Sequence, residues 1–108
     1  MQTEDRKRAA QRALVTSVLE GDGRATADQR RAAFDNVGLA EPLRTLVERV
    51  ALHPTHVTDA DVAAVTASGV SEDQVFELVV CAAVGQATRQ YEAALAALDA
   101  ATGDGHAA

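Results

Sequence analysis

The single thiol of this chain is the first group to ask about, because a thiolate is a strong nucleophile. Cys81 is the only cysteine, and its neighbours in sequence include Leu78, Val80, Ala82 and Val84. Burial among apolar side chains raises the pKa of a thiol and suppresses the reactive thiolate. One cysteine also rules out an internal disulfide or dithiol cycle within these residues. We expect Cys81 to be a packing residue, with a reactive or intermolecular thiol as the alternative.

Two histidines lie close together beside a proline. His53 and His56 flank Pro54, and Asp59 and Asp61 follow within a few residues, so a metal site with nitrogen and oxygen ligands is conceivable. However, a proline separates the two rings, and both carboxylates suit the first turn of a helix. We therefore predict no metal and interpret these histidines as polar loop residues.

Two charges interrupt the apolar segment that contains the cysteine. Glu77 and Arg89 are twelve residues apart, too far for an ion pair within one helix, so each needs solvent or another partner. We expect them to form salt bridges at a subunit interface, with Tyr91 packed so that its hydroxyl reaches the edge. The alternative is a cofactor-free enzyme. Glu77 with His53 or His56 would then act as acid and base, if burial raises the carboxyl pKa, while Arg89 and Tyr91 hold an acidic substrate.

The composition indicates a small hydrophobic core. The chain has 108 residues, of which 47% are hydrophobic, but its aromatic residues are only Phe34, Phe76 and Tyr91. Alanine, valine and leucine must build the core, and each buries little area. Such a domain often binds a second copy of itself, so we expect a homo-oligomer.

Charge argues against nucleic acid as a partner. The formal net charge is −6, whereas phosphate binding needs clustered basic residues. The basic cluster Arg6, Lys7, Arg8 and Arg12 has acidic neighbours and is interpreted as a solvated helix face, with a binding patch as the alternative. No apolar run approaches the roughly 20 residues of a membrane span, and the first residues lack the apolar stretch of a signal peptide, so we predict a cytoplasmic protein. Nine arginines to one lysine, with abundant alanine, suggest a GC-rich bacterial genome.

The pattern of apolar residues and breakers predicts an all-α bundle of about five helices. We expect a single domain over residues 1–102 and a frayed tail over 103–108. Helix starts are predicted at capping residues and helix ends at glycine or proline. The expected helices cover residues 3–20, 26–38, 42–53, 58–69 and 72–100.

The last expected helix is unusually apolar. One stripe comprises Phe76, Val80, Val84, Ala87, Tyr91, Ala94, Leu95 and Leu98, and further apolar residues make the first half hydrophobic nearly all round. A helix that is apolar on every side is buried on every side. We therefore expect this helix to be central, with part of its surface against another subunit and Gly85 allowing close approach.

Residues 52–98 carry a recognisable order of features. A "VTDADV" turn opens a short helix, "ASG" ends it, "SEDQVFELV" starts a long helix, and Arg89 follows about a dozen residues into it. This order resembles the carboxymuconolactone decarboxylase and alkyl hydroperoxidase D superfamily. The resemblance implies an all-helical fold that assembles as a dimer, trimer or hexamer.

The resemblance does not extend to the peroxidase chemistry. That branch uses a Glu-x-x-Cys-x-x-Cys motif followed by a histidine, upstream of the matched part, and residues 1–51 contain no cysteine. The decarboxylase branch needs no cofactor and relies on acid and base residues. We therefore predict a non-redox protein without a cofactor that assembles with itself or binds a partner protein, and we keep the acid/base enzyme acting on a small carboxylate as the alternative.

Overall fold

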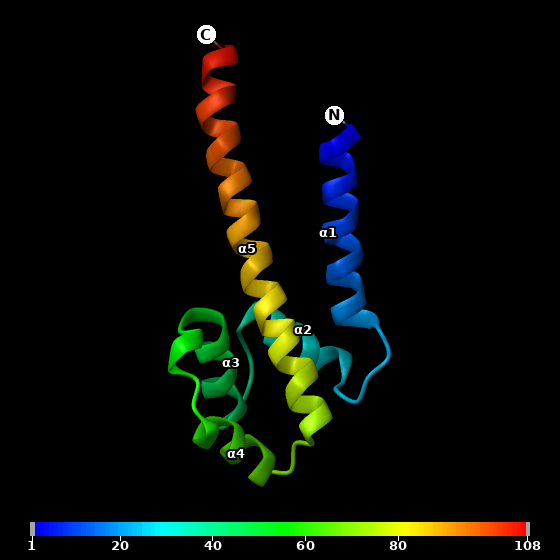
Figure 1. Cartoon of the computed structure of the whole chain (residues 1–108), viewed down its shortest axis with the longest axis vertical. Coiled ribbons are helices and arrows are strands. Elements are labelled where there is room, and N and C mark those ends of the chain that lie inside the picture. Colours follow the sequence, from blue (N-terminus) through cyan, green and yellow to red (C-terminus); the bar gives the residue numbers. More distant parts are fainter. Residues whose placement is uncertain (1, 108) are drawn as a thin grey trace.

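A computed structural model describes residues 2–107, apart from the side chains of residues 2, 4 and 103–107. The described residues form five α-helices and no strand, which confirms the all-α prediction. In chain order the elements are α1 (Gln2–Glu20), α2 (Ala27–Asp35), α3 (Leu43–Leu52), the 3₁₀ turn η1 (Pro54–His56), α4 (Asp59–Ala67) and α5 (Glu72–Ala107) (Figure 1).

Three helices begin at reciprocal capping boxes. In each, the cap hydroxyl accepts the backbone N–H three residues later, and the side chain there accepts the backbone N–H of the cap residue. These pairs are Thr26 with Gln29 before α2, Thr58 with Asp61 before α4, and Ser71 with Gln74 before α5. The predicted starts of these helices are therefore confirmed.

Left-handed residues end two of the short helices. Asn36 ends α2 at φ 55°, slightly before the Gly38 that the sequence suggested. Gly69 follows α4 at φ 105°, a conformation that glycine adopts without steric cost. Both ends turn the chain sharply, which keeps α2 and α4 short, and α2, α3 and α4 pack around the lower part of α5 (Figure 1).

Helix α5 is the central element, as predicted. It packs against α1, α2, α3 and α4, and its Leu78, Cys81 and Ala82 belong to the hydrophobic core. The largest fully buried side chains are Leu46, Leu78, Val47, Val65 and Cys81. The core is built mostly from aliphatic side chains, which agrees with the composition.

The apolar stripe of α5 is covered only in part. Its packed face contains Val75, Leu78 and Cys81, whereas Phe76 is 71% exposed and Leu98 is 58% exposed. Short helices cover a single face of a long rod, so burial on every side does not occur within one chain. The exposed part of the stripe is the surface for which the sequence predicts contact with another subunit, and that contact stays a prediction.

The outer parts of α1 and α5 extend beyond the packed helices. They form a two-helix arm in which α5 extends well beyond the start of α1, and the molecule is 58 Å long but only 28 Å and 21 Å across (Figure 1). Helix α5 reaches Ala107 rather than ending near Ala100, so most of the expected tail is helical backbone, and Ala108 lies outside the described residues. Fraying of this end stays a prediction. Within the described residues, no helix combines the length and apolar character that crossing a membrane requires.

Candidate functional site

Glu77 holds the loop between α1 and α2 in place. Its carboxylate accepts hydrogen bonds from the backbone N–H of Arg24, at 2.7 and 3.0 Å, and from that of Ala25, at 2.7 Å. The hydrogen bond from Ala25 is the main cause that lowers the pKa of Glu77, aided by that from Arg24 and by the charge of Arg30, against an opposing contribution from burial. A general base needs the opposite shift, so this carboxylate is better suited to accept hydrogen bonds than to transfer protons.

Arg30 is the charged residue that sequence reasoning missed. Its side chain is only 6% exposed, and it donates to the carbonyl oxygen of Gly21, while its Nε has no hydrogen-bond partner within the described residues. The tip of Arg30 and the carboxylate of Glu77 both crowd the position where a Cβ on Gly23 would lie. Arg30 and Phe34 are four residues apart on one face of α2, and this spacing was a signal that Arg30 faces the core.

Cys81 is a core residue, which confirms the packing interpretation. It is 1% exposed, and its Sγ donates to the carbonyl oxygen of Val18 on α1 at 3.3 Å. Burial raises the pKa of the thiol, and the nearby charge of Arg30 only partly opposes that effect. The thiol is therefore neutral and shielded in the folded chain.

Arg89 braces the end of α2 against α5. Its Nη1 donates to the carbonyl oxygen of Phe34 at 2.6 Å, and its Nη2 donates to the side chain of Gln86 at 3.0 Å. Gly85, one turn earlier, lies so close to Phe34 that a Cβ there would collide with the Phe34 backbone. Arg89 thus neutralises an unpaired helix-end carbonyl at a close helix contact, and the predicted close approach at Gly85 is confirmed.

His53 and His56 lie on the surface around η1. Their rings stack with centroids 5.3 Å apart and planes inclined by 13°. The capping carboxylate of Asp61 is already bound by the Arg49 guanidinium at 2.7 Å and by the Thr58 backbone N–H. Among the described residues, no group of three or more histidine, cysteine, aspartate or glutamate side chains is arranged to hold a metal ion.

The structure does not bring the predicted acid, base and substrate-binding residues into one pocket. Glu77 lines a small pocket of about 130 Å³ with Asp22 and Arg30, whereas Tyr91 lines a different groove. Glu77 and Arg89 are separated by about 18 Å of helix, at 1.5 Å per residue. His53 and His56 lie beyond α3. A joint catalytic role for Glu77, His53, His56, Arg89 and Tyr91 stays a prediction.

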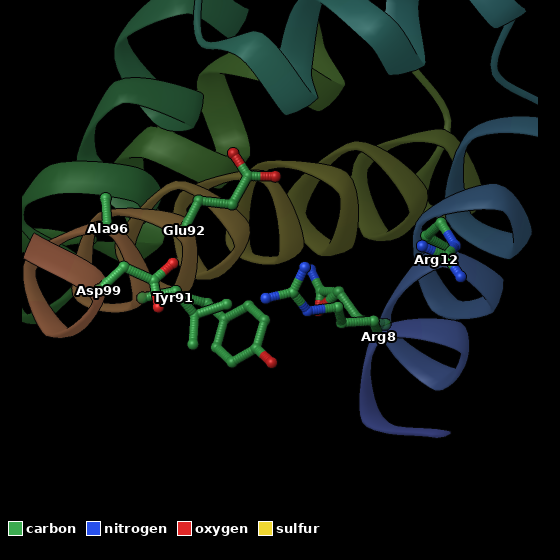
Figure 2. Close-up of a pocket in the computed structure, with 8 residues that line it drawn as sticks. Arg8, Arg12, Tyr91, Glu92, Ala96 and Asp99 are labelled. Atoms are coloured by element: carbon green, nitrogen blue, oxygen red, sulfur yellow. The ribbon is translucent and has the colours of Figure 1, made fainter. Parts of the chain in front are cut away.

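Two of the larger surface grooves lie along α5. The arm groove, of about 400 Å³, lies between α1 and the outer part of α5, and Figure 2 shows Arg8 extending from α1 toward Tyr91. The Phe76 groove, of about 510 Å³, lies between α4 and the start of α5. The charged lining of the arm groove is Arg8, Arg12, Glu92 and Asp99. The apolar lining of the Phe76 groove is Val62, Ala63, Val75, Phe76 and Val79.

The chain was compared with family models, curated proteins and solved structures, and none of the three comparisons gave a match. The resemblance to the carboxymuconolactone decarboxylase and alkyl hydroperoxidase D superfamily is therefore neither supported nor contradicted.

Proposed function

We propose that this protein is a self-assembling helical protein that acts through contacts with copies of itself and has no disulfide redox chemistry. The single, buried thiol of Cys81 supports the second part of the proposal, because a dithiol cycle needs two accessible sulfurs. The observation that carries the first part is the exposure of Phe76.

Phe76 is a large aromatic side chain that is mostly exposed, so its burial contributes little to the stability of a single subunit. It is 71% exposed on the first turns of α5, and it borders a groove whose lining is mostly apolar. Val62, across the groove on α4, is also exposed. A fully covered aromatic side chain buries about 150 Å² or more. Because Phe76 is 71% exposed, covering the rest of it is worth about 3 kcal/mol at about 25 cal/mol per Å². A contiguous exposed apolar patch of this kind is typical of an interaction site.

We expect a second copy of this chain to cover the Phe76 groove. The core consists largely of aliphatic side chains, so each subunit buries limited area and gains from sharing a surface. Two-fold contacts use the same patch on both subunits, which lets one exposed aromatic be covered by its own equivalent. The acid/base alternative has less support, because Glu77 has a lowered pKa and its proposed partners lie elsewhere.

Substitution of the exposed aromatic tests this proposal. We expect wild-type protein to exceed the monomer mass of 11.3 kDa in light scattering, and Phe76→Ser to weaken association by about tenfold or more, because the apolar contact is lost. Leu52→Ser is the matched control, since Leu52 is also exposed but lies at the end of α3, away from the Phe76 groove. Equal association of Phe76→Ser and wild type would contradict the proposed contact.

A further inference from the structure

The two walls of the arm groove carry opposite charges. Arg8 and Arg12 project from α1 with the i,i+4 spacing of one helix face, and Glu92 and Asp99 are two turns apart on one face of α5. All four side chains are exposed. The ion pairs found among the described side chains join other residues, and none of them involves Arg8, Arg12, Glu92 or Asp99.

Few contacts between the outer parts of α1 and α5 stabilise the arm. Most of its described residues are exposed, and the side-chain hydrogen bond found between its helices among these residues runs from Gln11 to Thr88 at 2.8 Å. Tyr91 and Leu95 line the groove but are only half-buried, and Leu98 beyond them is exposed. Helices in water derive most of their stability from packing of an apolar face, so an arm of this length gains from a covering partner.

We propose that the arm groove is a second contact between copies of this chain, separate from the Phe76 groove. This inference rests on the proposed self-assembly and adds a surface to it. A partner of one charge sign is attracted by one wall and repelled by the other, which disfavours nucleic acid. A second copy of this chain carries both charge signs, so it can match both walls. A two-fold axis running along the arms sets α1 against the partner subunit's α5, so that each basic wall meets an acidic one.

The heights of the charges along the arm agree with this arrangement. The bond between Gln11 and Thr88 marks a level shared by α1 and α5. Arg8 lies three residues toward the tip from Gln11, and Glu92 lies four residues toward the tip from Thr88, which is about one helical turn in each case. Rotation about an axis along the arms preserves height, so Arg8 comes level with the partner subunit's Glu92. Neighbouring helices in the resulting four-helix arrangement are antiparallel, as bundle packing favours.

Charge reversal with mixing tests this inference. One variant carries R8E and R12E, the other carries E92R and D99R, and both carry Phe76→Ser so that only the arms are measured. Each variant alone has two walls of like charge, and we expect its self-association to fall about tenfold or more. In an equimolar mixture at low salt, every wall again meets its opposite, so a mixed complex should form in analytical ultracentrifugation and dissociate at high salt, where screening is strong.

If the four charges interacted only within one chain, mixing the two variants would not restore association. A mixture that associates no more strongly than the separate variants, while circular dichroism shows both folded, would overturn the arm contact. If Phe76→Ser alone also lowers the mass of the assembled wild type, the proposed function stands and only the arm contact fails. A wild-type protein that is monomeric at every concentration would instead remove the proposed function itself.

Discussion

At the scale of single residues, Glu77 gives the sharpest stability prediction. Its carboxylate accepts three hydrogen bonds from the backbone N–H groups of Arg24 and Ala25. Glu77→Gln removes the charge and places an amide donor toward other donors. We expect the free energy of unfolding to fall by about 1–2 kcal/mol in urea titrations at neutral pH. Glu48→Gln, at an exposed position on α3, should change it by less than about 0.5 kcal/mol. Equal losses in the two variants would contradict the loop-holding role.

The same carboxylate predicts a dependence of stability on pH. Folding lowers the pKa of Glu77 below its usual value of 4.5, so its contribution is fully present above that value and is lost as pH falls through the folded pKa. Wild type should therefore lose stability on acidification more steeply than Glu77→Gln. The lowered pKa values of Glu41 and Asp61 contribute to both proteins and cancel in the comparison. Urea midpoints measured from neutral pH to below 4.5 provide the test; parallel curves would refute it.

Cys81 provides a chemical test of the core. Its burial and the raised pKa of its thiol should make it unreactive toward a thiol reagent while the chain is folded. After unfolding in denaturant, the same thiol should react at the rate of a free cysteine. Rapid modification of the native protein would show that the contact between α5 and Val18 on α1 opens easily.

The difference between Cys81 and Glu77 shows what the sequence could predict at this scale. The apolar neighbours of Cys81 are close to it in the sequence, so its burial could be predicted from them. Glu77 instead binds a loop 52 and 53 residues away, and no local pattern specifies such partners. Arg30 was missed for a different reason: its spacing to Phe34 was a local signal, but a charged residue is taken as exposed until its burying neighbours are known.

At the scale of helices, Gly85 decides how closely α2 approaches α5. A Cβ at this position would collide with the backbone of Phe34, which cannot yield as a flexible side chain can. Gly85→Ala improves helix propensity by about 1 kcal/mol, but we expect the collision to dominate and the free energy of unfolding to fall by about 2 kcal/mol. Ala83→Ser, on an exposed face of the same helix, is the control and should be nearly neutral. Thermal unfolding of both variants measures the difference; a stabilised Gly85→Ala would refute the close contact.

Helix starts were more predictable than helix surfaces. Thr26, Thr58 and Ser71 cap their helices through bonds that span three residues, so the sequence alone specified them. Which face of α5 is covered depends on the length and position of the other helices. Hence Phe76, which belongs to a regular apolar stripe, is nevertheless exposed. The extension of α5 to Ala107 was likewise not indicated by its glycine-containing end.

At the scale of the whole molecule, shape and surface point to assembly. A chain of 108 residues that is 58 Å long exposes more surface than a rounded subunit of the same size. Part of that surface is the aromatic ring of Phe76, and part is the pair of oppositely charged walls along the arm. In the proposed assembly, both features gain stabilising partners from the second copy.

The molar mass of the wild-type protein in solution, measured by light scattering over a range of concentrations, is the most direct test of self-assembly. We predict a mass that is a multiple of 11.3 kDa at the higher concentrations and that falls as the protein is diluted below its dissociation constant. A constant mass of 11.3 kDa throughout the range would contradict self-assembly.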